Sequence, residues 1–269
     1  MLEHGGNLND AARRFGRDRA QWIDLSTGIN PHWYPVPHRL PEINPDLAIA
    51  AAEYYGAPLM LPVAGTQAAI QALPRLRAPS RIVVAAPSDA EHADHWAQHG
   101  HALRQVPYAE LDAEVADCDV MVIRNPNNPT GASVAPGRLL EWAGQLRARG
   151  GWLVVDEAFG DTDPEASVGA ASDRPGLIVL HSVGKFFGLA GPRLGFVAAH
   201  PALLDALADL LGPWTISGPA QEIACAALRD REWQIRMRAR RGIRLGLPPD
   251  AASWQRLALA LDEWNGNLR

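Results

Sequence analysis

Short, continuously apolar runs separated by longer stretches with helical spacing dominate the chain from residue 46 onward. The apolar runs lie at 82–86, 120–123, 153–155, 178–180 and 196–199. Helices are predicted between and around them at 48–55, 66–76, 136–149, 202–211 and 219–229. Continuous apolar strands that alternate with helices are typical of a parallel sheet buried on both faces. The pattern therefore predicts an α/β fold with a mostly parallel central sheet sandwiched by helices.

The two ends of the chain have a different character. Residues 1–45 are rich in Gly, Asn, Pro and His, which predicts an irregular N-terminal arm. Residues 46–212 form the expected large domain. Residues 213–269 are expected to form a reduced C-terminal domain, with a strand-like run at 243–247 and a helix at 251–264.

Composition excludes several kinds of partner. Among 269 residues, 47% are hydrophobic and 20% charged, and the formal net charge is −5. The densest basic stretch, 229–244, is expected to be a solvated helix face, so no nucleic-acid partner is predicted. No apolar run approaches the roughly 20 residues of a membrane span. We expect a cytoplasmic protein in which Cys118 and Cys225 are reduced core residues.

Nine histidines suggest a metal site at first, because four of them fall between positions 92 and 101. Their spacing matches no ligating pattern such as H-E-x-x-H, so no metal is expected.

Lys185 is the sole lysine of the chain and follows the predicted strand 178–180. It lies in the phrase Ser182-Val183-Gly184-Lys185, beside glycines and aromatic residues. A partly desolvated lysine has a lowered pKa and is suited to forming a Schiff base. A surface lysine is the usual interpretation of such a loop, but its uniqueness here favours a functional role.

Two acids, Asp156 and Glu157, end the predicted strand 153–155. A carboxylate at this edge can pair with the protonated ring nitrogen of a cofactor, and it can equally cap a helix. Glu157 is the weaker candidate, because it is expected to be exposed.

Two further segments have a turn composition that admits a second interpretation. The phrase Asn125-Pro126-Asn127-Asn128-Pro129-Thr130-Gly131 can be a turn, or it can hold an amide rigidly toward a ring hydroxyl. Gly65-Thr66-Gln67 opens a predicted helix, where backbone N–H groups can bind a phosphate.

The order of these motifs resembles fold-type-I pyridoxal-phosphate (PLP) enzymes of aminotransferase class I/II. Within that class the chain is most similar to the threonine-phosphate decarboxylases of cobalamin biosynthesis, which are related to histidinol-phosphate aminotransferase. Several phrases carry this closer resemblance: His4-Gly5-Gly6-Asn7, Leu25-Ser26-Thr27-Gly28-Ile29-Asn30-Pro31, Gly184-Lys185-Phe186-Phe187-Gly188-Leu189-Ala190-Gly191, Gly212-Pro213-Trp214 with Ser217-Gly218-Pro219, and Ile243-Arg244-Leu245-Gly246-Leu247-Pro248.

The resemblance implies a role for each matching residue. Lys185 would bind the PLP aldehyde, Asp156 the pyridinium nitrogen and Asn128 the ring hydroxyl. Arg244 would clamp the substrate carboxylate, while His4, near the substrate phosphate, and Asn30 would face the substrate. The remaining matches concern the cofactor phosphate: Gly65, Thr66, Gln67, Ser182 and Arg193 would hold it, and Tyr55 would reach that of a partner subunit in a homodimer.

The implied reaction is decarboxylation of L-threonine O-3-phosphate to (R)-1-aminopropan-2-ol phosphate. Decarboxylases and aminotransferases share these motifs, so a second function stays open: an aminotransferase that acts on a small or phosphorylated amino acid such as histidinol phosphate. A third reading is an inactive cofactor-binding relative. The residues alone do not choose among these alternatives.

Three features depart from the family pattern. The C-terminal part is shorter than an ordinary small domain of roughly 100 residues. Asp89 occupies the position where relatives place an aromatic that stacks on the cofactor ring, and His92 and Trp96 are the candidates to replace it. Phe159 stands where many aminotransferases have a tyrosine, which favours the decarboxylase branch.

Overall fold

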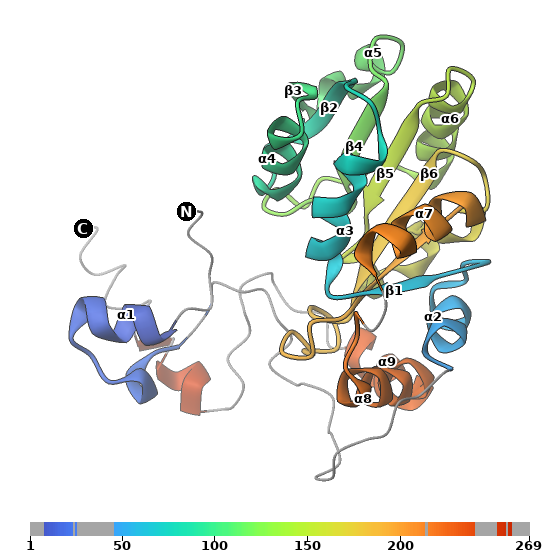
Figure 1. Ribbon diagram of the computed structural model, residues 1–269. Coiled ribbons are helices and arrows are strands. Elements are labelled where there is room, and N and C mark those ends of the chain that lie inside the picture. Colours follow the sequence, from blue (N-terminus) through green and yellow to red (C-terminus); the bar gives the residue numbers. More distant parts are fainter. Residues whose placement is uncertain are drawn as a thin grey trace.

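The computed structural model describes residues 8–23, 25, 46–212, 215–239, 252–256 and 258–259. In this part of the chain a seven-stranded sheet has the order β1-β7-β6-β5-β4-β2-β3 (Figure 1). Neighbouring strands from β3 to β6 are parallel, whereas β7 runs antiparallel to both β6 and β1. The prediction of a mostly parallel sheet is confirmed. The strands are β1 (Leu61–Val63), β2 (Arg81–Ala86), β3 (Ala102–Pro107), β4 (Val120–Arg124), β5 (Trp152–Asp156), β6 (Leu177–Ser182) and β7 (Gly195–Ala199).

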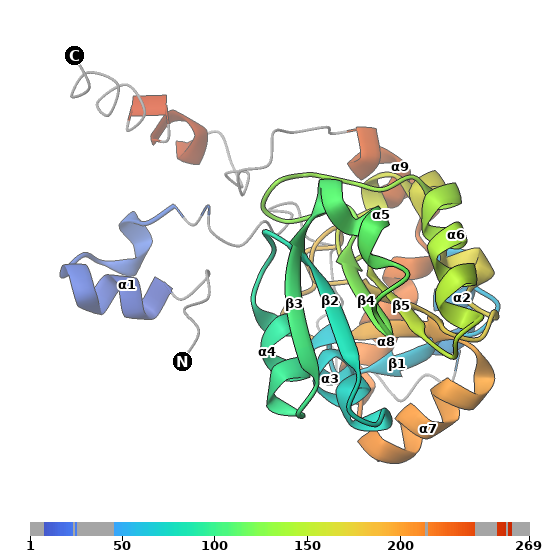
Figure 2. The ribbon, with the colours of Figure 1, turned by 90° about the horizontal axis from the view of Figure 1, so that it is seen from above.

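Helices cover both faces of the sheet, as the sequence predicts (Figure 2). One face packs against α3 (Thr66–Ala72), α4 (Glu91–Gln98) and α7 (Pro201–Leu211). The other face packs against α2 (Leu47–Tyr55), α5 (Leu111–Glu114), α6 (Pro136–Arg147), α8 (Gly218–Arg229) and α9 (Arg231–Ala239). Helix α1 (Leu8–Phe15) precedes these elements in the chain.

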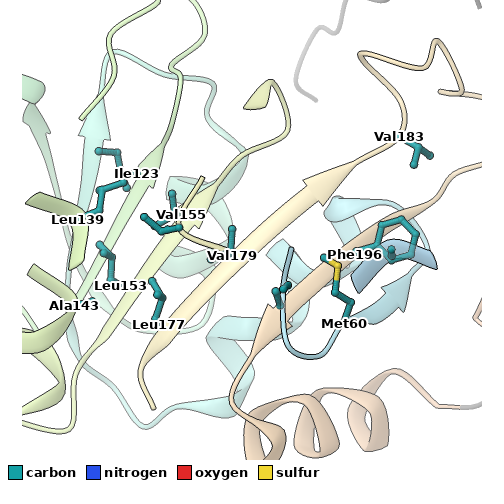
Figure 3. Close-up of a cluster of buried hydrophobic side chains, with 14 of the residues drawn as sticks. Met60, Ile123, Leu139, Ala143, Leu153, Val155, Leu177, Val179, Val183 and Phe196 are labelled. Atoms are coloured by element: carbon teal, nitrogen blue, oxygen red, sulfur yellow. The ribbon is translucent and has the colours of Figure 1, made fainter. Parts of the chain in front are cut away.

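The central strands are apolar throughout because both of their faces are buried. In β5, Leu153 and Val155 face one core while Val154 faces the other, and all three have 0% exposure. Burial of one such side chain contributes about 1.5–3 kcal/mol to stability. Figure 3 shows the cluster between β4, β5, β6 and α6.

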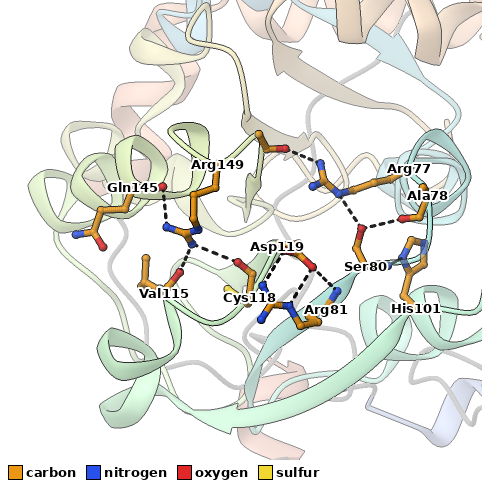
Figure 4. A network of polar contacts seen from close by, with 11 residues as sticks. Arg77, Ala78, Ser80, Arg81, His101, Val115, Cys118, Asp119, Gln145 and Arg149 are labelled. Atoms are coloured by element: carbon orange, nitrogen blue, oxygen red, sulfur yellow. Dashed lines mark hydrogen bonds and ion pairs between the residues drawn. The ribbon is translucent and has the colours of Figure 1, made fainter.

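Polar contacts join the loops at the amino ends of the parallel strands (Figure 4). Arg81, which begins β2, pairs with Asp119 at 3.0 Å. Arg77 donates to the backbone oxygen of Gly150 at 3.0 Å, and Arg149 donates to that of Cys118 at 3.3 Å. These contacts fix where the strands begin, and the carboxyl ends are left to carry other side chains.

The five central strands are confirmed within two residues at each end, but the two edge strands were missed. Strand β3 has four exposed positions out of six, so it lacks the apolar run that marks the central strands. Strand β1 has only three residues. The expected irregular arm is wrong for residues 8–15, which form α1. Cys118 and Cys225 are buried free thiols, as predicted.

Helices α8 and α9 pack on the same core as α2, through Ala224, Cys225, Leu228 and Trp233. The predicted boundary of a small domain at residue 213 stays a prediction. Among the described helices, none has the length and apolar character that crossing a membrane demands.

Candidate active site at the carboxyl ends of the strands

The predicted chemical residues come from adjacent strand ends. Asp156 ends β5, Ser182 ends β6, and Lys185 follows three residues later. Residue Asn128 lies in the loop after β4, which is the other neighbour of β5. Because β4, β5 and β6 are parallel, their carboxyl ends meet at one edge of the sheet, where ligands bind in this class of fold.

The Asp156 carboxylate is almost completely buried, with 1% exposure, and three groups donate to it. Oδ2 accepts from Arg124 Nη2 at 3.0 Å and from His92 Nε2 at 3.1 Å. Oδ1 accepts from the backbone N–H of Ala158 at 3.0 Å. Burial by itself raises the pKa of Asp156, but Arg124, His92 and this N–H outweigh it and hold that pKa below its usual range. The side chain is therefore a fixed anion.

Lys185 is half-buried, and its Nζ lies 5.4 Å from the centroid of the Phe159 ring. Phe159 follows Asp156 by three residues, so this contact brings the lysine loop over the end of β5. The loop is closed by backbone bonds from Gly188 N to Lys185 O and from Leu189 N to Val183 O, each 3.2 Å. The sole lysine thus lies beside the segment that follows the buried carboxylate.

A cradle for an anion forms where α3 begins. Gly65 has φ 74° and ψ 156°, and a Cβ added to it would lie 2.9 Å from Arg193 Nη2. A Cβ on Gly195, which pairs with Ser182 in the sheet, would lie 2.7 Å from Thr66 N. Gly65, Thr66, Ser182 and Arg193 therefore come together with no side-chain carbon between the guanidinium and the turn. This donor set fits a phosphate group.

Backbone strain marks Arg193. Its φ of 54° makes it the sole described non-glycine residue with positive φ. Strained non-glycine residues cluster at functional sites, where surrounding structure holds them. This position adds weight to Arg193 as a phosphate ligand.

The side chain of Gln67 bonds to helix α4 and is not part of the cradle. Its side chain donates to Glu91 Oε2 at 2.6 Å and lies 3.1 Å from His95 Nε2, both on α4. The side chain therefore joins α3 to α4, and the backbone N–H of Gln67 is what remains for a phosphate.

The loop after β4 is held by its own asparagines. Asn125 Oδ1 accepts from Val134 N at 2.8 Å, and Asn127 Nδ2 donates to Pro87 O at 2.8 Å. Asn128 is half-buried in the same loop. Its role toward a ring hydroxyl stays a prediction.

The structure describes Asp89 and both candidates to replace the missing aromatic. His92 donates to the Asp156 carboxylate, and stacking of its ring on a cofactor stays a prediction. Trp96 is 1% exposed and packs edge-on against His101 at 4.7 Å, so it belongs to the core and cannot replace the expected aromatic. Asp89 pairs with Arg124. No spacing in the sequence links His92 and Arg124 to Asp156, because the three meet only through strand order.

Tyr55 is partly buried beside β6. Its ring stacks on His181 at 4.0 Å between centroids with an interplanar angle of 24°. His181 precedes Ser182 in β6 and therefore points to the opposite face of the sheet. The role of Tyr55 at the phosphate site of a partner subunit stays a prediction.

Glu157 is buried, with 2% exposure, although the sequence suggested an exposed neighbour of Asp156. The reason is that Ser167 and Val168 cover the second face of the sheet at the end of β5. Glu157 Oε2 accepts from Ser167 Oγ at 2.5 Å, and Oε1 accepts from Val168 N at 2.9 Å. Burial raises the pKa of Glu157 from 4.5 to about 7.

Asp161 extends this buried acidic region toward α2 and α9. Burial raises its pKa to about 7, and its Oδ1 accepts from Tyr54 Oη at 3.0 Å. Arg238 of α9 donates to Tyr54 Oη at 3.0 Å and to Asp161 O at 2.9 Å. Burial also lowers the pKa of His181 to about 3, so this imidazole is neutral.

The predicted substrate contacts His4, Asn30 and Arg244 lie outside the described residues. The structure therefore describes the cofactor side of the candidate site.

A family model for aminotransferase class I and II matches residues 38–244. Two curated relatives are similar over most of the chain, and both are threonine-phosphate decarboxylases. The protein from Pseudomonas aeruginosa is 53% identical over 241 residues, which cover 87% of this chain and 73% of the relative. The protein from a Sinorhizobium species is 46% identical over 241 residues, with 85% and 72% covered.

Solved structures share the fold. Histidinol-phosphate aminotransferase from Sinorhizobium meliloti, solved in complex with pyridoxal-5'-phosphate, superposes with a TM-score of 0.72 at 22% identity. The match covers 89% of this chain and 74% of that one. At this identity the likeness concerns the fold, and it confirms the predicted sheet architecture.

Proposed function

Because the chain belongs to the aminotransferase class I and II family, we propose that it is a PLP-dependent decarboxylase of L-threonine O-3-phosphate. Three features at one edge of the sheet carry the proposal. They are the sole lysine, the buried anionic Asp156, and the cradle formed by Gly65, Thr66, Ser182 and Arg193. The relatives that are 53% and 46% identical support the choice of reaction and substrate.

The residues fit the cofactor in three places. Lys185 Nζ would bind its aldehyde, and Asp156 would hold the ring nitrogen in its protonated form. The phosphate would lie in the cradle of Gly65, Thr66, Ser182 and Arg193, and Asn128 would bind the ring hydroxyl. When bound, PLP supplies a ring that withdraws electrons from the substrate Cα.

In the proposed reaction the bond between Cα and the carboxylate breaks. CO2 leaves, and a proton takes its place on Cα, which gives (R)-1-aminopropan-2-ol phosphate. The fixed negative charge of Asp156 favours this step, because it keeps a proton on the ring nitrogen and so keeps the ring electron-withdrawing. His92 and the Ala158 N–H orient that carboxylate.

We assign the predicted substrate contacts by the same proposal. Arg244 would bind the substrate carboxylate through two parallel hydrogen bonds, for which a guanidinium is well suited. His4 and Asn30 would complete the substrate site, with His4 near the phosphate.

The first test uses the uniqueness of Lys185. PLP is added to the purified chain, the complex is reduced with sodium borohydride, and the peptides are analysed by mass spectrometry. We expect one modified peptide, carrying the cofactor on Lys185, and no modified lysine peptide in Lys185→Ala. A wild-type chain with no fixed cofactor would overturn the proposal.

A second test separates the reactions. The PLP-loaded chain is incubated with threonine phosphate, and CO2 and aminopropanol phosphate are measured. We expect the two products in equal amounts. Conversion of the cofactor to its amine form, with a keto acid and no CO2, would instead identify an aminotransferase.

We also propose that the chain acts as a homodimer in the cytoplasm, within cobalamin biosynthesis. Large apolar side chains exposed on α2 and α9, namely Ile49 (56%) and Ile235 (67%), support association. Light scattering coupled to size-exclusion chromatography should give twice the 29.1 kDa mass of one chain. A mass of 29.1 kDa at micromolar concentration would contradict the dimer.

A further inference from the structure

A buried guanidinium joins two carboxylates beside the proposed ring site. Arg124, the last residue of β4, is 8% exposed. Its Nη2 lies 3.0 Å from Asp156 Oδ2, and its Nη1 is paired with Asp89 Oδ2. The sheet register places Arg124 directly opposite Asp156, and Asp89 comes from the segment between β2 and α4. Three charged side chains from three neighbouring strand ends thus share one place.

The charges in this group have a consequence for Asp156. A buried guanidinium needs a carboxylate partner, since an unpaired charge in the interior is costly. If Asp156 were its sole partner, the charges of the two would cancel. With Asp89 included, the charges of Asp89, Arg124 and Asp156 sum to −1. His92 contacts the same Asp156 oxygen at 3.1 Å in every variant considered below, so it does not enter the differences between them. The group of three retains one net negative charge, which favours a proton on the ring nitrogen.

The hydrogen bonding of the group is incomplete. Among the described residues, Arg124 Nε and Asp89 Oδ1 are buried atoms without a hydrogen-bond partner. The Asp89 side chain is 36% exposed, but these two atoms are enclosed, and buried polar atoms usually have a partner, so each exception calls for an explanation. A site that positions a charge for a ligand provides one.

We propose that Asp89 is the counter-charge of Arg124, so that Asp156 keeps its negative charge for the ring nitrogen of the cofactor. This inference rests on the proposed function, in which Asp156 faces that nitrogen. Asp89 and Arg124 are then positioning residues that act through Asp156. Asp89 stands where relatives place a stacking aromatic, and in this proposal its charge affects the proton on the ring nitrogen.

The test uses PLP labelled with 15N in the ring, whose chemical shift reports whether that nitrogen carries a proton. The shift is followed across a pH series for wild type, Asp89→Asn, Arg124→Gln and the double variant, each loaded with cofactor. Asp89→Asn leaves Arg124 to neutralise Asp156. We expect the proton affinity of the ring nitrogen to fall at least about tenfold, the size of effect that removal of a nearby charge has on a titrating group.

The other two variants should behave differently. Arg124→Gln removes the cation and leaves both carboxylates, so the nitrogen should stay protonated. In the double variant the charges at positions 89, 124 and 156 again sum to −1, so the 15N chemical shift should return to the wild-type value. Asp119→Asn is the matched control, because it removes an arginine–aspartate pair of 3.0 Å at the opposite ends of the strands. Its shift should equal that of the wild type.

Several outcomes would overturn the inference. They are an unchanged shift in Asp89→Asn, an equal change in the double variant, and an equal change in Asp119→Asn. If Asp89→Asn fails to fold while the double variant folds, the counter-charge is supported. If neither variant folds, the inference is overturned, because two charges that balance each other should be removable together without loss of folding. Failure of the wild type to bind PLP would instead contradict the proposed function.

Discussion

At the residue scale, Gly65 adopts a conformation that other residues avoid. Its φ of 74° and ψ of 156° lie in a region that is essentially restricted to glycine. The same residue allows the guanidinium of Arg193 to approach the turn before α3, since an added Cβ would lie 2.9 Å from Nη2. Gly65 thus combines a backbone requirement with a requirement of the proposed phosphate site.

Gly65→Ala should therefore weaken PLP binding at least about tenfold, because the methyl group displaces Arg193, and should cost about 1–3 kcal/mol of stability. Gly56→Ala is the control. Gly56 also has positive φ, 65°, but an added Cβ would have nothing within 4 Å. This variant should lose about 1–2 kcal/mol and bind PLP normally. Fluorescence titration and urea unfolding measure both effects, and equal PLP affinities in the two variants would contradict the cradle.

A second prediction at this scale concerns the buried carboxyl group of Glu157. Its pKa rises from 4.5 in the unfolded chain to about 7 in the folded chain. Between these values the unfolded chain releases the proton first, so stability falls as pH rises. The contribution of this one group is about 1.4 kcal/mol per pH unit. Glu157→Gln should lose this dependence, which urea unfolding at pH 5, 6 and 7 would reveal.

The slope is the criterion for Glu157, because lost hydrogen bonds to Ser167 and Val168 shift stability equally at every pH. Asp161 also has a pKa of about 7 and is one cause of the raised pKa of Glu157, so the change in slope reports the pair of buried carboxyl groups. Glu141→Gln on the exposed side of α6 is the control and should leave the slope unchanged. Parallel curves for wild type and Glu157→Gln would contradict the buried-carboxyl argument.

At the element scale, α9 is tied to the loop that carries Lys185. Trp233 stacks on Phe187 at 5.5 Å with an interplanar angle of 11°, and meets Phe186 edge-on at 5.5 Å. Arg238 Cζ lies 5.6 Å from the centroid of the Phe186 ring. Because Phe186 follows Lys185 directly, packing of α9 positions the lysine backbone.

Trp233→Leu should lower both stability and PLP affinity, by about 2–4 kcal/mol and at least about fivefold respectively. Trp142→Leu on α6 is the matched control, because Trp142 is 3% exposed in the same core and Trp233 is 5% exposed. It should lose similar stability but keep its PLP affinity. Thermal unfolding and cofactor titration test the pair, and similar affinity losses in both would contradict the coupling.

At the scale of the whole molecule, the proposed site lies across the ends of β4, β5 and β6 and the start of α3, so a bound cofactor would contact elements that are distant in sequence. Such a ligand stabilises the fold by mass action. PLP at 100 times its dissociation constant should add about 2.7 kcal/mol to the free energy of unfolding, which dialysis should remove. At the same PLP concentration Lys185→Ala should gain less, since without the covalent bond its dissociation constant is larger. Urea unfolding checks both, and equal gains would contradict the role of Lys185.

The sequence by itself determined the central sheet and the chemical residues at its edge. Continuous apolar runs at 120–123, 153–155 and 178–180 require burial on both faces, which places these strands inside a parallel sheet. The strand order then brings residues that follow them, such as Asp156 and Lys185, to one edge. Edge strand β3 escaped prediction because solvent exposure removes the apolar signal.

Tertiary structure alone decided what surrounds those residues. Arg124 meets Asp156 because β4 pairs with β5, and His92 reaches it from the start of α4; no spacing along the chain encodes that neighbourhood. Glu157 is buried for the same reason, since the segment 164–168 covers it on the second face of the sheet. Periodicity indicates which face of an element is buried, but the partners of a buried charge depend on packing between elements distant in sequence.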